Sequence, residues 1–134
     1  RDNKMFTVVD EYGHHPTEIK AVINATKKGF PKKDIYLVFQ PHRYTRTRDC
    51  YSEFLSVLKI PKKVFLFDIY SAGEDSIADI STEKLIKDLK GNKSFFLPKG
   101  SGANKIILEN ITSNSIVLIM GAGSIGTFVK KFIE

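Results

Sequence analysis

The sequence predicts an α/β domain, and two observations support that prediction. Strand-like and helix-like segments alternate from one end of the chain to the other, which is typical of parallel sheets covered by helices. Strand-like segments such as residues 64–67 and 116–119 are apolar at every position, as a sheet buried on both faces requires. We therefore expect an open, mostly parallel, Rossmann-like sheet of about five or six strands with helices on both faces.

Five strand–helix steps account for the chain. Pro16 suits the first turn of a helix because its fixed backbone angle is already helical. The apolar spacing that follows defines the inner side of this helix as Ile19, Val22, Ile23, Ala25 and Thr26. The expected strands are residues 5–9, 35–39, 64–69, 95–97 and 116–120. The expected helices begin at Pro16 and otherwise cover residues 51–58, 81–89, 103–110 and 125–133.

Length and composition are those of one ordinary globular domain, residues 1–134, with 42% hydrophobic residues. The one cysteine, Cys50, has no internal disulfide partner, and we expect it to be a small buried filler within a helix. No apolar stretch reaches the ~20 residues of a membrane span, and the start does not resemble a signal peptide. We expect a cytoplasmic protein without membrane contacts. The polar residues 1–4 have the character of an internal segment of a longer protein.

The formal net charge of +6 raises the question of an anionic partner. Much of the excess lies in scattered lysine pairs at expected helix ends and turns, where lysine is typical of a solvated surface. The arginines differ because Arg43, Arg46 and Arg48 cluster in one loop and the turn after it. A planar guanidinium suits phosphate or carboxylate better than an ammonium group does, so this cluster predicts an anionic small ligand.

A first polar string, residues 10–16, follows the first expected strand and combines two carboxylates, a phenol and two imidazoles. Ligands of open α/β sheets bind outside the carboxyl ends of the strands, so this combination predicts part of a ligand site. Capping of the following helix is the alternative for any single residue. His14 and His15 are adjacent and their side chains diverge, so we expect only one of them to face a ligand.

A second polar string, residues 40–46, follows the second expected strand and holds His42, the third histidine of the chain. Arg43 and Arg46 are three positions apart, so a helix that begins near Tyr44 places them where they can hold a common anion. Several cations at a helix N-terminus cost a few tenths of a kcal/mol each unless an anion is bound there. The alternative is a solvated basic helix start.

The segment 121–126 matches the dinucleotide-binding fingerprint, because it follows a strand and opens a helix. That fingerprint also needs a second strand with an acidic residue about 20 positions further on, and the printed sequence ends at Glu134. We interpret the segment as a tight turn whose amides face a substrate group, with close helix packing as the alternative, and expect no NAD or FAD.

Two further features have less definite meaning. A third strand-end loop, residues 68–74, carries Glu74 beyond a flexible glycine, and the sequence alone assigns it no role. A zinc site would have to be built from His14, His15, His42 and Cys50. Their spacing matches no usual zinc-ligand pattern, so we expect no metal ligands in this chain.

These strings resemble the C-terminal domain of the Mur ligases, the ATP-dependent enzymes that form amide bonds in bacterial peptidoglycan synthesis. The resemblance spans nearly the whole chain, and the second string is similar to the members that join L-alanine to UDP-N-acetylmuramate. The motifs that carry it, in order, are Tyr12-Gly13-His14-His15-Pro16-Thr17-Glu18, Phe39-Gln40-Pro41-His42-Arg43-Tyr44-Thr45-Arg46, Tyr70 with Ala72-Gly73-Glu74, and Met120-Gly121-Ala122-Gly123 with Ile125-Gly126.

The resemblance implies a three-domain enzyme, in which one domain holds UDP, a central domain carries an ATP-binding P-loop, and the C-terminal domain closes over both with the amino acid. This chain corresponds to the last domain, so we expect no turnover and only weak ATP binding from it alone. In the family, the γ-phosphate passes to the muramyl carboxylate and the L-alanine amine attacks the acyl phosphate. Mg²⁺ neutralises phosphate charge in the complete enzyme.

The same resemblance implies roles for individual residues. The catalytic residues, which hold the substrate carboxylate and the developing negative charge, are His42, Arg43 and Arg46. The residues beside the substrate are Tyr12 and His14, on the amino-acid side, and Gly121, Ala122 and Gly123. The nucleotide ribose is contacted by Asp10 or Glu11, and the choice stays open because Glu11 stands where the family has an aspartate.

Two other functional classes remain as alternatives. A phosphate-ligand or nucleic-acid-binding module would use the positive charge, but the sequence has no aromatic run suited to stacking on bases, so we expect no nucleic-acid partner. A non-catalytic interaction domain would use the strand-end residues as a protein interface. The resemblance favours UDP-N-acetylmuramate, L-alanine and the two other domains as partners, with this chain itself a monomer.

Overall fold

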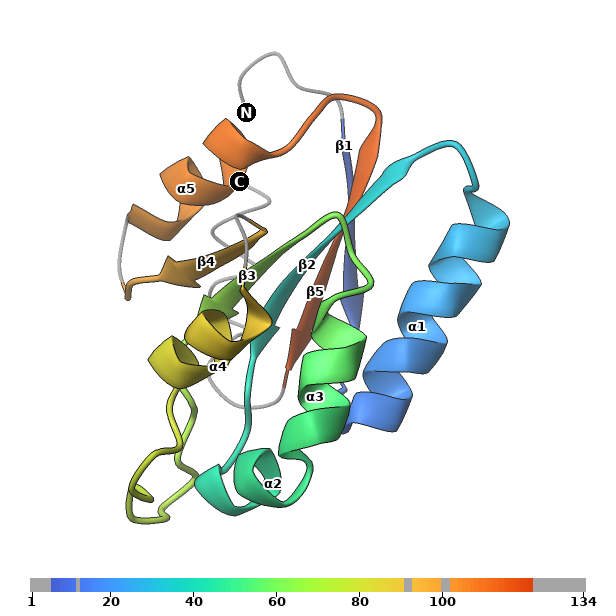
Figure 1. Cartoon of the computed structure of the whole chain (residues 1–134). Coiled ribbons are helices and arrows are strands. Elements are labelled where there is room, and N and C mark those ends of the chain that lie inside the picture. The colour runs from blue at the N-terminus through green and yellow to red at the C-terminus, as the bar shows by residue number, and fades with distance from the viewer. Residues whose placement is uncertain (1–5, 12, 91–92, 100–101, 122–134) are drawn as a thin grey trace.

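The fold is one five-stranded parallel sheet with helices packed against it, and a computed structural model describes residues 6–11, 13–90, 93–99 and 102–121. The strands are β1 (Phe6–Glu11), β2 (Asp34–Gln40), β3 (Lys63–Phe67), β4 (Ser94–Leu97) and β5 (Ser115–Gly121). The helices are α1 (Pro16–Gly29), α2 (Tyr44–Asp49), α3 (Tyr51–Leu58), α4 (Thr82–Leu89) and α5 (Gly102–Asn110). Figure 1 shows the strands running toward a common lower end, and this confirms the predicted α/β class.

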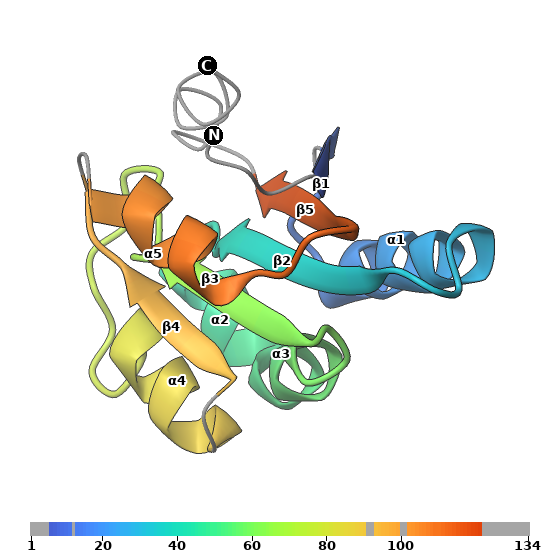
Figure 2. The same cartoon turned by 90° about the horizontal axis from the view of Figure 1, so that it is seen from above.

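Both faces of the sheet are covered, as the apolar strands predicted. Alternate residues of β2 point to opposite sides, so Leu37 joins one buried cluster and Val38 joins the other. The first cluster packs against α1, α3 and α4, and the second packs against α5. Figure 2 shows α5 on one side of the sheet and the other helices on the opposite side.

Helix α1 shows how the local sequence produces this packing. Pro16 occupies its first turn, as predicted, and Ile19 and Ile23 are fully buried against the sheet. Burying one such side chain contributes about 1.5–3 kcal/mol. Val22 and Thr26 are half-buried, but Ala25 is exposed, so its predicted inward position is wrong. Among the described residues, no helix is long and apolar enough to cross a membrane.

Several element boundaries differ from those predicted. The first strand continues to Glu11, because parallel pairing with Ile119 and Met120 of β5 satisfies the backbone despite the polar side chains. The third strand ends at Phe67, before the predicted residue 69. The second helix is two helices, α2 and α3, and Cys50 lies between them rather than inside one. The helix expected at residues 125–133 falls outside the described residues.

The order of the strands brings the two polar strings together. The sheet runs β1-β5-β2-β3-β4, so β5 lies between β1 and β2 and pairs with both. Glu11 pairs with Met120 at the end of β1, and Gln40 pairs with Gly121 at the end of β2. The loops after β1 and β2 therefore leave the sheet at the same edge, the one formed by the carboxyl ends of the strands, and only β5 separates them. This edge is where ligands of open α/β sheets bind.

Candidate functional site

The loops after β1 and β2 meet through two imidazoles, as the strand-end argument predicted. The ring centroids of His14 and His42 are 5.4 Å apart, with the planes tilted by 42°. Both side chains are half-buried. The two polar strings therefore form one site, although 28 positions of sequence separate these two residues.

The side chains of His15 and His14 have different partners, and His14 is the one that lies beside His42. Nδ1 of His15 accepts a hydrogen bond from the backbone N–H of Thr17 at 3.2 Å and so caps α1. The Glu18 carboxylate accepts from the backbone N–H groups of His14 and His15 at 3.0 Å each, which lowers the pKa of Glu18. The capping alternative is thus correct for His15, while the ring of His14 lies beside His42.

A third loop, between β3 and α4, forms backbone hydrogen bonds to the second polar string, residues 40–46. The backbone N–H of Tyr70 donates to the carbonyl of Pro41 at 2.8 Å, and the N–H of Arg43 donates to the carbonyl of Tyr70 at 2.7 Å. The Tyr70 ring stacks on His42 with centroids 5.4 Å apart and planes at 17°. Sequence reasoning gave this loop no role, and its one signal was a set of polar residues directly after a buried strand.

The two arginines lie at the start of α2, which begins at Tyr44 as predicted. Arg43 is the residue before the helix, and its guanidinium Nη1 is 3.8 Å from the Glu74 carboxylate with 46% of the side chain exposed. Arg46 donates from Nη1 to the carbonyl of His42 at 3.2 Å and lies 3.4 Å from His42 Nδ1. Each arginine therefore has a neighbour within the protein before any ligand binds.

The two imidazoles of the site are disfavoured as cations. Partial burial lowers the pKa of His14, and the positive charge of Arg46 lowers it further. Partial burial also lowers the pKa of His42, with His14 and Arg46 as the next causes. Arg43 acts in the same direction on both rings. At neutral pH the site therefore combines two permanently charged guanidinium groups with two neutral imidazoles, which suits an anion together with a proton to be removed.

The remaining site residues are less fully placed. Gly13 is buried, and a Cβ added to it would lie 2.8 Å from Met120 Cε, so its small size serves packing against β5. Asp10 and Glu11 form the end of β1 instead of a loop. Gly121 is the last residue of β5, not part of a turn, because it pairs with Gln40. Tyr12, Ala122 and Gly123 lie outside the described residues.

Cys50 packs against the first core cluster, as expected of a filler, but it is half-buried rather than buried. Its Sγ is 3.8 Å from Nε2 of His15. Burial raises the pKa of this thiol, and the nearby Glu53 raises it further. Within the described ranges, no three histidine, cysteine or acidic side chains are grouped so that they could hold a metal ion.

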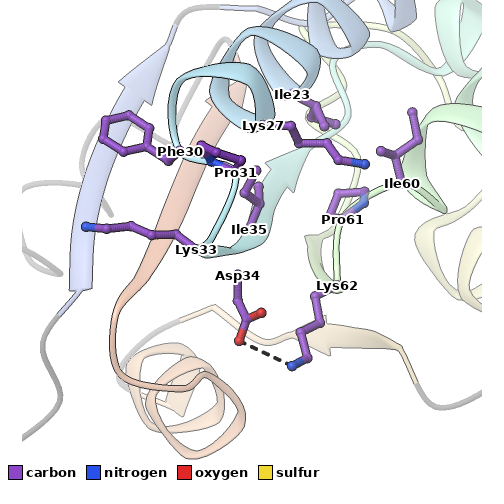
Figure 3. Close-up of a pocket in the computed structure, with 10 residues that line it drawn as sticks. All are labelled: Ile23, Lys27, Phe30, Pro31, Lys33, Asp34, Ile35, Ile60, Pro61 and Lys62. Atoms are coloured by element: carbon purple, nitrogen blue, oxygen red, sulfur yellow. Dashed lines mark hydrogen bonds and ion pairs between the residues drawn. The ribbon is translucent and has the colours of Figure 1, made fainter.

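A pocket of about 410 Å³ lies at the opposite, amino end of the strands. Figure 3 shows it between the end of α1, the start of β2 and the turn before β3, with Lys27, Lys33 and Lys62 around it. Asp34 and Lys62 form an ion pair at 3.2 Å on its rim. None of the histidines or arginines named above lines this pocket, so it is separate from the candidate site.

Fold and site together define a class: a parallel α/β domain whose strand-end loops bring two arginines and two imidazoles together. The family described as "Mur ligase, glutamate ligase domain" matches residues 1–123, and the chain belongs to this family. The resemblance to the Mur ligases, inferred above from four ordered motifs, is thus confirmed.

Individual proteins similar to this chain are also ligases of this family. The UDP-N-acetylmuramate--L-alanine ligase of Methylobacillus flagellatus is 42% identical over 100% of this chain and 29% of its own length. The crystal structure of UDP-N-acetylmuramate-alanine ligase from Thermotoga maritima superposes with a TM-score of 0.72 at 26% identity, covering 99% of this chain and 27% of that one. A ligase-domain structure from Haemophilus ducreyi has the same fold, with a TM-score of 0.71 at 21% identity over 98% of this chain and 94% of that one. The chain thus spans less than a third of the first two proteins.

Proposed function

We propose that this chain is the amino-acid-binding C-terminal domain of an ATP-dependent ligase that joins L-alanine to UDP-N-acetylmuramate in bacterial peptidoglycan synthesis. The observation that carries the proposal is the convergence of His14 with His42, Arg43 and Arg46. These residues lie in the motifs by which the sequence resembles the L-alanine-adding ligases. The relatives with that activity match the whole chain, which supports the same assignment.

The proposed reaction converts a carboxylate and an amine into an amide. ATP supplies a phosphoryl group that activates the muramyl carboxylate, and Mg²⁺ neutralises phosphate charge. Transfer of that phosphoryl group leaves ADP and an acyl phosphate. The L-alanine amine, after losing a proton, then attacks the carbonyl carbon of the acyl phosphate, and the tetrahedral intermediate collapses to the amide by breaking the bond to phosphate, which leaves. In the complete ligase, the UDP-binding and ATP-binding domains would make most of the contacts with the two nucleotides. Asp10 or Glu11 of this chain would contact the nucleotide ribose.

In this reaction Arg43 and Arg46 hold the substrate carboxylate and the negative charge that develops on oxygen in the tetrahedral intermediate. A guanidinium that donates two parallel hydrogen bonds matches carboxylate geometry, and charge-assisted bonds of this kind contribute about 1.5–3 kcal/mol each. His42 directly precedes Arg43 in sequence, and its backbone carbonyl accepts a hydrogen bond from Arg46, so we place it in the same anion-binding group.

The neutral imidazoles have a separate role. The amine of L-alanine is an ammonium ion at neutral pH and must lose a proton before it can attack. A neutral imidazole can accept that proton, whereas an imidazolium cannot. His14 and Tyr12 are assigned to the amino-acid side of the site by the resemblance of their motif, and the lowered pKa values of His14 and His42 keep the acceptors available.

The experiment is an assay of the complete ligase that contains this chain, with ATP, UDP-N-acetylmuramate and each of several amino acids. We expect ADP formation that depends on L-alanine, and at least a hundredfold loss of turnover in a His42→Ala variant, about the contribution of a positioned acid–base group. The isolated chain should be inactive and should bind ATP no more tightly than about millimolar. Ligation of a different amino acid, turnover by the isolated chain or micromolar ATP binding would contradict the proposal.

A further inference from the structure

The loop after β3 does more than border the site. We propose that Glu74 is a positioning residue, whose carboxylate holds the loop carrying His42 and Arg43 in a single conformation through Thr45. This inference deepens the proposed function and rests on it for the catalytic role of that loop. The sequence gave Glu74 no role, and the contacts that define one join residues 29 positions apart.

Both carboxylate oxygens of Glu74 are engaged. Oε1 accepts from the backbone N–H of Thr45 at 3.0 Å, and Oε2 accepts from the Thr45 hydroxyl at 2.6 Å. Oε2 is also 3.8 Å from Nη1 of Arg43. The Glu74 side chain is only 19% exposed, so solvent competes little for these bonds. These contacts fix the side chain of Glu74 against the start of α2.

Helix α2 depends on the Glu74 carboxylate for capping, because its own N-cap residue makes no side-chain hydrogen bond to the helix. Arg43 stands at the N-cap position and makes no side-chain hydrogen bond to the first turn. An N-cap side chain ordinarily accepts from the second or third backbone N–H of the helix. Thr45 is the second residue of α2, so Glu74 performs the capping from a distant loop, and its negative charge suits the positive end of the helix.

The backbone of Arg43 shows why the contact matters for geometry. Its φ of 77° lies in the left-handed region that side chains other than glycine rarely adopt. Such a conformation persists only where surrounding contacts hold it, and these are the bridge to Tyr70 on one side and the Glu74–Thr45 bonds on the other. The contacts thereby set the directions in which Arg43 and the neighbouring His42 leave the backbone.

Glu74 is itself held by the turn that precedes it. The backbone N–H of Glu74 donates to the carbonyl of Ser71 at 3.0 Å, and Ala72 and Gly73 have positive φ values of 51° and 88°. The turn begins next to Tyr70, which pairs with the second string and stacks on His42. One short loop therefore contributes a backbone bridge, a ring stack and a helix cap to the same segment.

The first part of the test measures conformation and does not depend on activity. Hydrogen–deuterium exchange of the complete ligase would be followed for the segment 41–49 in Glu74→Ala, Glu74→Gln and Asp75→Asn variants. Glu74→Ala should raise exchange in this segment about tenfold, since a lost helix cap exposes the first-turn amides, and Glu74→Gln should raise it less. Asp75→Asn is the matched control, because it removes a neighbouring charge from an exposed side chain and should change nothing.

The second part measures catalysis in the same variants. Glu74→Ala should lower kcat with L-alanine about tenfold or more, with little change in KM or thermal midpoint, because misplacing a catalytic group slows the chemical step. Thr45→Val, which removes only the hydroxyl, should give a smaller loss. Unchanged exchange in Glu74→Ala would refute the contact as a positioning device, whatever the enzyme's substrate. Raised exchange with unchanged kcat would refute its catalytic importance. A wild-type ligase that ignores L-alanine would overturn the proposed function, while the exchange result would still decide the role of Glu74.

Discussion

The two ends of the sheet both carry positive charge, but they use it differently. At the carboxyl end the cations are Arg43 and Arg46, each within reach of a specific partner from a strand-end loop. At the amino end they are lysines such as Lys27 and Lys28, in the last turn of α1. Lysines at helix C-termini are stabilised by the helix dipole and stay in solvent, so they need no ligand to explain them.

This difference shows why charge and cavities alone do not locate the site. The pocket at the amino end has three lysines around it, one of which already pairs with Asp34 (Figure 3). Lys27 belongs to the last turn of α1, and Lys33 and Lys62 lie in the turns before β2 and β3, all of them usual places for a solvated lysine. At the carboxyl end, by contrast, hydrogen bonds and ring contacts among three separate loops bring imidazoles and guanidinium groups together. A fixed arrangement of unlike groups is what a reaction requires.

Among the substitutions that compare the two ends of the sheet, the largest effect is expected from changing the shape of the cations at the carboxyl end while keeping their charge. Arg43→Lys and Arg46→Lys in the complete ligase should each lose about 2–4 kcal/mol of transition-state stabilisation, or ~30-fold or more in kcat/KM. Steady-state kinetics with L-alanine would measure this, and the thermal midpoint should hardly change. Lys33→Arg at the amino end is the matched control. If both lysine variants keep near-native turnover, the arginines belong to the solvated surface after all.

A smaller effect is expected from replacing glycine by alanine at two positions, Gly13 before α1 and Gly29 at the end of α1. Gly13→Ala should destabilise the fold by about 1–2 kcal/mol, because the new Cβ forces the buried Met120 side chain to move. Gly29→Ala meets no atom within 4 Å and should be neutral or slightly stabilising, since alanine favours the helix. Thermal or urea unfolding of the chain would compare them. Equal effects would mean that Gly13 is not tightly packed.

The imidazole pair should make the stability of the protein depend on pH below 6.5. The folded-state pKa values of His14 and His42 lie below the ordinary 6.5, so protonation favours unfolding. Stability is therefore complete above pH 6.5 and is lost as pH falls from 6.5 through the lowered pKa values. The thermal midpoint should fall by a few degrees on that side. A His14→Gln/His42→Gln variant should lose this slope, and an unchanged slope would show that other groups cause it.

Acidic groups should lose their contribution in a separate and lower window. The pKa of Glu74 is lowered by its bonds to Thr45, and that of Glu18 by the backbone bonds of its capping box. Each contributes stability that is present above its ordinary pKa of 4.5 and is lost as pH falls through the lowered value. In the His14→Gln/His42→Gln variant, which removes the histidine contribution, hydrogen exchange of segment 41–49, corrected for the intrinsic pH dependence of amide exchange, should therefore rise below pH 4.5 and not between pH 5 and 6.5. A rise in the higher window would contradict the role of Glu74.

The smallest effect is expected at the amino-end pocket. Lys27→Ala and Lys62→Ala should change kcat/KM by no more than about twofold and stability by no more than ~0.5 kcal/mol, because exposed lysines and surface ion pairs contribute little. The same kinetic and unfolding measurements apply. A large loss of turnover in either variant would mean that this end also takes part in the reaction.

Much of this architecture could be predicted because periodicity and strand-end chemistry are local signals. The buried positions Ile19 and Ile23 follow from helical spacing, and α2 begins at Tyr44, the position expected for it. The meeting of His14 with His42 also follows, since strand ends of a parallel sheet share one edge.

Other features depend on contacts that no local pattern contains. Asp10 and Glu11 look like loop residues by polarity, but pairing with β5 draws them into a strand. The direction of the backbone at the start of α1 makes His15 the capping residue and leaves His14 beside His42. Two adjacent histidines in a sequence do not show which of them will take which position. The role of Glu74 depends on a tertiary contact to Thr45 across 29 positions.

The most direct test of the central claim is where the substrate carboxylate binds. A crystal structure of the complete ligase with UDP-N-acetylmuramate, L-alanine and a non-hydrolysable ATP analogue would show it. We predict a substrate carboxylate within hydrogen-bonding distance, about 2.7–3.2 Å, of the guanidinium of Arg43 or Arg46, with the rings of His14 and His42 beside it. Substrate carboxylates held away from both arginines, or L-alanine bound in the amino-end pocket, would contradict the account.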